Sequence, residues 1–231
     1  MENNTFKHRK KERFITGLIF IIITLYNIIE GGIIFDFFLL IIFSVSIIEI
    51  VNIINNKKYK RLKNKHLIAL ISFCYIILSF ISIKVIRNSS NGHCYTILLY
   101  LSLWLFDSIS YITGRLMKGK KISIKISPKK TWNGFIAGIF FTILIYNVFF
   151  NAFFQRICIL KVKNIDVLYM FTILVMSLIG DLTESYLKRS CRVKDSSEIL
   201  NGHGGILDRL DSLLLTSIFL YSNLKIQHYF Y

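Results

Sequence analysis

The feature that most constrains this chain is a series of apolar runs, each close to the length needed to cross a lipid bilayer. A helix that spans the hydrocarbon core, about 30 Å thick, needs about 20 residues. Backbone groups in lipid must be satisfied within the segment, which favours helices. The sequence therefore predicts an all-α fold, a polytopic membrane bundle of about seven transmembrane helices in one domain, 1–231. The predicted spans are 14–29, 33–54, 67–86, 95–114, 132–154, 165–187 and 206–224.

The composition agrees with this class and limits the partners. Hydrophobic residues make up 54% of the chain, which has a single proline and a formal net charge of +16. Such a charge attracts anionic partners. The basic residues are scattered among the loops between spans instead of forming one soluble face, so nucleic acid is not expected as a partner. Anionic membrane lipids and a nucleoside triphosphate fit better. The four cysteines are far apart and are expected to be reduced.

The basic residues also predict the orientation, because cytoplasmic loops of membrane proteins are enriched in lysine and arginine. Of the 29 basic residues, 23 fall in the segments 7–13, 57–65, 115–130 and 188–209, which alternate spans would place on one side. The expectation is a cytoplasmic N-terminus in the inner membrane of a bacterium or an equivalent organelle membrane. Both charged loops of the second half would then face the cytoplasm.

A dense run of charged residues lies between the last two spans, in 185–211. Charges at the edge of an apolar segment are costly unless they are paired, solvated or bound to a metal. Helical spacing puts Asp181, Glu184 and Lys188 on one face, and Asp208 and Asp211 start the next helix. Carboxylates from two helices suit a hard cation such as Mg²⁺. The glycines in 202–205 leave backbone N–H groups open to a bulky anionic ligand.

Two blocks of this sequence resemble the phosphatidate cytidylyltransferase (CDP-diglyceride synthase) family. The first block matches its signature at Ser185, Lys188-Arg189, Lys194-Asp195, Gly202-His203-Gly204-Gly205, Asp208-Arg209 and Asp211. The second block covers 107–115 and 126–132. Asn201 stands where the family usually has proline, and Asn133 where it usually has glutamate. Residues 1–94 resemble the family only in hydropathy, so the catalytic part is expected in 95–231.

The resemblance implies transfer of CMP from CTP to phosphatidic acid, giving CDP-diacylglycerol and pyrophosphate. It implies Mg²⁺ as cofactor, with Asp181 and Asp208 as ligands. The lipid phosphate is already anionic, so its attack on the α-phosphorus needs no strong base. The implied catalytic residues are Lys188, Arg189, Lys194, Asp195, His203, Arg209 and Asp211. The implied substrate-binding residues are Asp107, Ser127, Lys129, Lys130, Ser185, Gly202, Gly204 and Gly205.

Other interpretations stay open at this stage. A related enzyme could use CTP on another lipid phosphate, and a cation transporter could use Asp107, Asp181 and Asp208 as an ion path, although transporters place such acids deep in the membrane. The sequence also leaves open a homodimer and a monovalent cation such as K⁺ beside Mg²⁺. Glu49 lies in an apolar run outside the matched blocks. An intramembrane acid is a functional candidate by default, but near a helix end it more often meets water or a neighbouring helix.

Overall fold

The computed structural model describes residues 2–55, 65–150, 167–197, 199 and 204–230. Within these residues the chain forms seven α-helices, one short π-helical turn and two short strands. The first four helices are α1 (Glu2–Glu30), α2 (Gly32–Ile54), α3 (Lys65–Asn88) and α4 (Gly92–Met117). After the strands come α5 (Trp132–Ile145), the turn η1 (Tyr146–Phe150), α7 (Val167–Ser190) and α8 (Leu207–Phe230). The predicted helical membrane bundle is confirmed, since each predicted span overlaps one of these helices; residues 151–154 and 165–166 of two predicted spans lie outside the described residues.

Four helices among the described residues are long and apolar enough to cross a membrane: Gly32–Ile54, His66–Asn88, Gly92–Met117 and Val167–Ser190. Shorter apolar helical stretches cover Ile15–Glu30 and Trp132–Val148. Large apolar side chains are exposed on the outside of the bundle, among them Ile22, Ile33 and Leu70. This is the pattern expected of a bundle whose outer surface contacts lipid tails instead of water.

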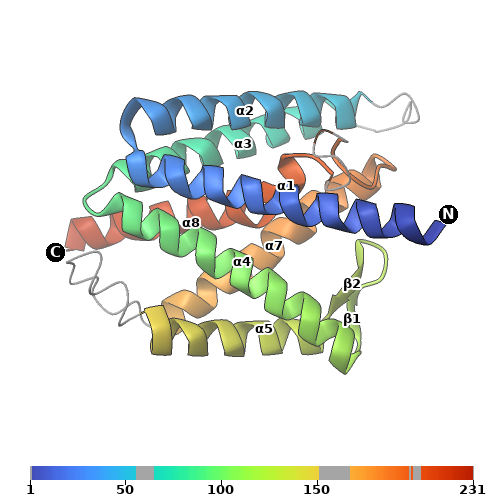
Figure 1. Cartoon of the computed structure of the whole chain (residues 1–231). Helices are drawn as coiled ribbons and strands as arrows, with labels where there is room; N and C mark the ends of the chain where they lie inside the picture. The colour runs from blue at the N-terminus through green and yellow to red at the C-terminus, as the bar shows by residue number, and fades with distance from the viewer. Residues whose placement is uncertain (1, 56–64, 151–166, 198, 200–203, 231) are drawn as a thin grey trace.

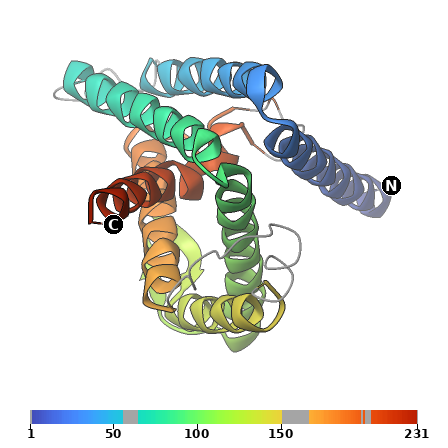
Figure 2. The ribbon, with the colours of Figure 1, turned by 90° about the vertical axis from the view of Figure 1, so that its left-hand side faces the viewer.

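The helices run up and down, so that alternate chain reversals lie at the same end (Figure 1). The N-terminus, the ends of α4 and α7 and the start of α8 all lie at one end, which we call the motif end. Figure 2 shows α8 between α3 and α7, with α5 against α4 and α7. A core cluster joins α2, α3, α4, α7 and α8 through residues such as Phe35, Ile76 and Leu214. The matched blocks therefore rest on a core that includes the unmatched helices.

Glycines allow two pairs of helices to approach closely near the motif end. A Cβ atom at Gly138 of α5 would lie 1.9 Å from Ser110 Oγ of α4. At Gly180 of α7 it would lie 2.7 Å from the carbonyl oxygen of Asp211 in α8. Small residues at such crossings let the backbones meet. The second crossing places the turn that carries Asp181 directly against the turn that carries Asp211.

The strands β1 (Lys121–Ser123) and β2 (Ser127–Thr131) form an antiparallel hairpin between α4 and α5. In its register Lys121 faces Thr131 and Ser123 faces Ser127. The Thr131 side chain then caps α5 by accepting a hydrogen bond from the Gly134 N–H at 3.1 Å. The sequence predicted only a basic loop here. The segment has no Asn-Gly or Asp-Gly turn, the strongest hairpin signal, although Ile122, Ile124 and Ile126 alternate with polar residues as in a strand.

The expectation that all four cysteines are reduced was wrong at Cys94. Cys94, at the start of α4, is disulfide-bonded, whereas Cys74 and Cys191 are not in a disulfide. A disulfide depends on how close two Cα atoms come in space, and distance along the sequence does not report this. The start of α4 lies at the end of the bundle opposite the motif end (Figure 1).

Candidate active site

Charged side chains from α4, the hairpin, α7 and α8 gather at the motif end. They form two acid–lysine pairs, which we name by position. The pocket pair is Asp181 with Lys130, and the loop pair is Asp208 with Lys188. Each pair joins two separate elements of the fold, because Lys130 comes from β2 and Lys188 from α7. Both pairs consist of residues predicted to form the site.

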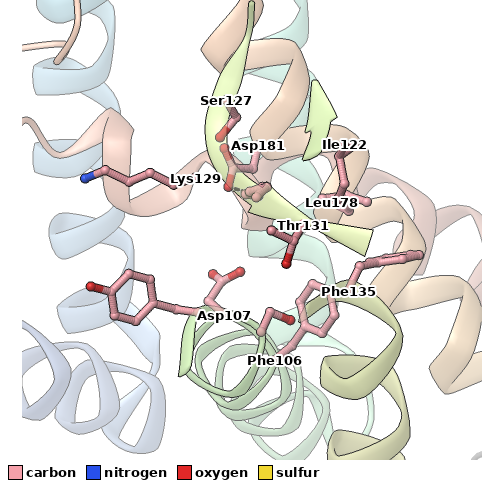
Figure 3. A pocket seen from close by; sticks show the side chains of 12 residues that line it. Phe106, Asp107, Ile122, Ser127, Lys129, Thr131, Phe135, Leu178 and Asp181 are labelled. Atoms are coloured by element: carbon pink, nitrogen blue, oxygen red, sulfur yellow. Dashed lines mark ion pairs between the residues drawn. The ribbon is translucent and has the colours of Figure 1, made fainter. Parts of the chain in front are cut away.

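The pocket pair lies in a cavity of about 210 Å³ between α4, the hairpin, α5 and α7 (Figure 3). Asp107 of α4 and Asp181 of α7 lie on facing walls of this cavity. Asp181 also accepts a hydrogen bond from the Ser185 hydroxyl at 3.2 Å. One wall is apolar, with Phe106, Phe135 and Leu178. The cavity therefore offers charged groups on one side and an apolar surface on the other.

Asp107 also lines a second cavity, of about 230 Å³, between α1, α4 and α8. Asp208, Arg209 and Asp211 line this second cavity as well. Asp107 and Asp211 lie close enough to interact electrostatically with each other and with Asp181. The Ser212 hydroxyl lies 3.5 Å from Asp107 Oδ2. The two cavities thus lie on either side of one carboxylate, and acids from three helices face them.

The loop pair lies deeper, and Asp208 there accepts four hydrogen bonds. Lys188 Nζ donates to Oδ1, and Oδ2 accepts from the Ser196 N–H at 2.8 Å, the Ser196 hydroxyl at 3.0 Å and the Gly205 N–H at 2.9 Å. Gly204 has φ of +80°, and a Cβ there would lie 2.4 Å from Asp208 Oδ2. The loop before α8 is therefore folded around the Asp208 carboxylate, and glycine is required where the backbone passes it.

Lys188 has a second acidic neighbour, because its Nζ lies 3.0 Å from Glu184 Oε1 one turn earlier on α7. The pair is at ion-pair distance but not in hydrogen-bond geometry, and neither oxygen of Glu184 has a hydrogen-bond partner among the described residues. All three side chains are largely buried, with side-chain exposures of 8% for Lys188, 5% for Glu184 and 11% for Asp208. One lysine thus compensates two buried carboxylates.

The remaining predicted residues lie at different distances from these pairs. Ser127 lines the first cavity, and the exposed Lys129 is on its rim (Figure 3). Arg189 donates to the carbonyl oxygens of Ile126 at 3.4 Å and Val193 at 3.1 Å, so it ties α7 to the hairpin. Lys194 and Asp195 are exposed. Gly202 and His203 lie outside the described residues.

The sequence left one polar residue of this region unassigned. Glu49 of α2 is fully buried and accepts hydrogen bonds from Ser196, Ser197 and the first turn of α8. Its partners are about 150 residues further along the chain, so no local pattern reports the contact. The available signal was an acid inside an apolar run.

The donors at the motif end fit a hard divalent cation in type, since carboxylate oxygens are what Mg²⁺ prefers. Asp107, Asp181 and Asp211 bring three carboxyl groups together, and Lys130 pairs with Asp181. Within the part of the chain that the structure describes, no three Asp, Glu, His or Cys side chains are close enough to hold a metal by themselves. Substrate phosphates would have to complete such a site, as is usual for Mg²⁺.

Comparison with known proteins shows which family the chain is similar to. The profile of the cytidylyltransferase family matches residues 6–227. Over 146 residues the chain is 34% identical to the phosphatidate cytidylyltransferase of Rickettsia conorii, covering 61% of this chain and 63% of that protein. It is 37% identical over 153 residues to the protein of the same name from Staphylococcus haemolyticus, covering 62% of this chain and 55% of that protein. It is also 37% identical over 117 residues to the Haemophilus influenzae protein of that name, covering 50% and 40%.

The aligned parts span about 40–63% of the length of these relatives. The family profile, in contrast, covers nearly all of this chain, including the helices outside the two matched blocks. The chain therefore belongs to the cytidylyltransferase family.

Proposed function

We propose that this protein is a membrane-embedded nucleotidyltransferase, a CTP:phosphatidate cytidylyltransferase. The observation that carries the proposal is the pocket pair, in which Asp181, four residues before the first matched block, and Lys130 of the second block meet in a cavity that also holds Asp107. The names of the relatives support CTP and phosphatidic acid as substrates. The reaction would give CDP-diacylglycerol, a precursor in phospholipid biosynthesis, and pyrophosphate.

In this reaction an oxygen of the lipid phosphate forms a bond to the α-phosphorus of CTP. The bond from that phosphorus to the oxygen bridging to the β-phosphate breaks, and pyrophosphate leaves with the electron pair. The lipid phosphate is an anion, so no side chain has to remove a proton from it. The task of the protein is to hold two anions together. Lys130 and Lys129 of β2 are placed to attract phosphates at the cavity, and preorganised charges of this kind stabilise such transition states.

We assign Asp181 and Asp208 as the residues that would hold Mg²⁺, with Asp107 and Asp211 adding negative charge nearby. A bound Mg²⁺ would neutralise phosphate charge and align the reacting groups. Lys188 holds the Asp208 side chain in place, and Ser185 does the same for Asp181. A monovalent cation such as K⁺ beside Mg²⁺ stays a proposal that competition with other monovalent cations would test.

The proposed location is the inner membrane, with the motif end at the cytoplasmic face, where CTP is available. The lysine and arginine asymmetry supports this orientation. Cysteine substitution at Lys194, which is exposed, and at Ser123 of β1 tests it in intact cells. An impermeant thiol reagent is expected to leave both unlabelled until the membrane is opened. Labelling of either one in sealed cells would reverse the orientation.

The decisive experiment uses purified protein, Mg²⁺ and CTP labelled at the α- or the γ-phosphate. Label from the α position is expected in the lipid phase, and label from the γ position in the aqueous pyrophosphate. Lipid labelled from the γ position would mean a CTP-dependent kinase and would contradict the proposal. Phosphatidic acid is compared with other lipid phosphates, so that a related enzyme acting on another lipid is recognised. A cation transporter is disfavoured because the acids gather at one end of the bundle, not along its depth.

A further inference from the structure

The buried acid of α2, Glu49, contacts the segment that carries the loop pair. Its side chain has 0% exposure and lies near the C-terminal end of α2. Oε1 accepts from the Ser197 hydroxyl at 2.6 Å and the Ile206 N–H at 3.0 Å. Oε2 accepts from the Ser196 hydroxyl at 2.8 Å and the Leu207 N–H at 2.8 Å. The four donors come from both sides of the glycine-containing part of the signature.

Two of these donors are the backbone groups that begin α8. The first N–H groups of a helix have no partner within it, and the positive end of the helix dipole favours a carboxylate there. Glu49 satisfies this requirement from a different helix. It therefore fixes where α8 starts, and Asp208 is the residue directly after Leu207.

Glu49 is also linked to Asp208 through one side chain. The Ser196 hydroxyl lies 2.8 Å from Glu49 Oε2 and 3.0 Å from Asp208 Oδ2, and its single hydrogen is shared between two carboxylates. Gly205 packs against both partners, because a Cβ there would lie 2.0 Å from Ser196 Oγ and 2.4 Å from Glu49 Oε1. No side chain fits between α2 and this loop.

Ser46, one turn earlier on the same buried face of α2, shows what an ordinary polar group of this helix does. Its hydroxyl donates at 2.8 Å to the carbonyl oxygen of Ile42 in its own helix. The hydrogen bonds of Glu49 all go to the signature segment, and their donors within the described residues are uncharged. A buried carboxylate is costly unless it is fully hydrogen-bonded. The Glu49 carboxylate is hydrogen-bonded in a way that holds the loop before α8 against α2.

We infer that Glu49 is a positioning residue for the cytidylyltransferase reaction. It holds Ser196, Ser197 and the first turn of α8 so that the Asp208 carboxylate keeps its place beside Lys188 and the second cavity. The inference rests on the proposed function, since it names a further residue on which that reaction depends. Glu49 does not itself touch substrate, and its effect is transmitted through Ser196 and the backbone of α8.

The test variant is Glu49→Gln, which keeps the side-chain volume but replaces one acceptor oxygen with an NH₂ donor. Serine hydroxyls can rotate away from this group, but the N–H groups of Ile206 and Leu207 cannot. The matched control is Ser46→Ala, which removes a buried polar group from the same face of α2. The first measurement, amide hydrogen exchange, needs no substrate. Exchange at Ile206 and Leu207 is expected to rise about tenfold or more in Glu49→Gln and to stay unchanged in Ser46→Ala.

The second measurement is turnover against Mg²⁺ concentration at matched amounts of folded protein. Residues that orient ligand groups typically change activity or metal affinity about 10–100-fold. Glu49→Gln is expected to lower kcat in this range and to raise the half-saturating Mg²⁺ concentration, with little change in KM for the lipid. A residue with only a structural role would lower the folded amount and leave the Mg²⁺ requirement of the folded protein unchanged.

If Glu49→Gln does not fold, Ser196→Ala removes only the hydroxyl that joins the two carboxylates. It is expected to raise the Mg²⁺ requirement in the same direction. Wild-type exchange at Ile206 and Leu207, or wild-type kcat and Mg²⁺ dependence in an active variant, overturns the inference. Failure of the unmodified protein to make CDP-lipid would instead overturn the proposed function. The exchange rates at Ile206 and Leu207 would then still test whether Glu49 holds the start of α8.

Discussion

The two acid–lysine pairs at the motif end use the same chemical groups in opposite settings. Asp181 and Lys130 line a cavity, with side-chain exposures of 17% and 25%. Asp208 and Lys188 have exposures of 11% and 8%, and Asp208 accepts four hydrogen bonds. The pocket pair has room for a ligand, whereas the loop pair forms a more buried frame, in which Asp208 also borders the second cavity. Changes in the first should affect mainly rate, and changes in the second should also affect stability.

The largest effect on the frame is expected from Lys188→Met. Methionine fills similar space but leaves Glu184 and Asp208 buried without their cation. Removing one partner of a buried ion pair typically costs about 3–5 kcal/mol. The melting temperature in detergent should fall strongly, while Lys125→Met, at an exposed position of the hairpin turn, should leave it unchanged. Equal melting temperatures for the two variants would contradict the buried frame.

The pocket pair is tested by Asp181→Asn, which keeps the shape of the side chain and removes its charge. We expect turnover to fall by about 10²–10³-fold, equivalent to roughly 2.7–4 kcal/mol, with little change in melting temperature. The half-saturating Mg²⁺ concentration should rise. Asp36→Asn is the matched control, because Asp36 pairs with Lys84 at 2.9 Å on α2 and α3, outside both cavities of the site. Full activity in Asp181→Asn would remove Asp181 from the metal assignment.

A smaller loss is expected from Gly205→Ala, which adds one methyl group to the frame. The new Cβ would lie 2.0 Å from Ser196 Oγ and 2.4 Å from Glu49 Oε1, so the loop must shift. Overpacking of this kind typically costs about 1–3 kcal/mol. Both melting temperature and kcat should fall. Gly119→Ala is the control, because the added methyl would meet only the flexible Asn133 side chain and should be tolerated. Equal effects of the two substitutions would argue against tight packing of the loop around Gly205.

The smallest effect is expected on the pocket side, from Thr131→Ala. The substitution removes the side-chain cap of α5, which typically costs about 1 kcal/mol. Because Thr131 ends the strand that carries Lys130, KM for CTP should rise more than kcat falls. Thr113→Ala is the control, since the Thr113 hydroxyl donates only within its own helix, to Ile109 at 2.6 Å. The measurement is KM for CTP in the two variants at equal melting temperature. Equal KM values would contradict the role of Thr131 in placing Lys130.

The sequence predicted the helices well because each apolar run has bilayer length and each needs its own helix to satisfy its backbone. It also predicted that the two matched blocks lie on the same side of the bundle, since alternate loops of an up-and-down bundle share one end. It did not predict the hairpin, whose strands have only three and five residues. Nor could it separate the environments of Asp181 and Asp208, because both are acids with basic residues nearby in the sequence. That difference depends on which element supplies the lysine.

The contact between Glu49 and Ser196 spans 147 residues, and this has a consequence for biosynthesis. A ribosome adds about 5–20 residues per second, so roughly 7–30 s separate the synthesis of the two partners. During that interval α2 is complete, but the donors that satisfy its carboxylate have not yet been translated. The segment that begins α8 must therefore be translated before Glu49 of α2 can form its hydrogen bonds. The reaction centre is therefore among the last parts of the molecule to assemble, and a nascent chain that stalls before α8 exposes an unsatisfied acid within its membrane helices.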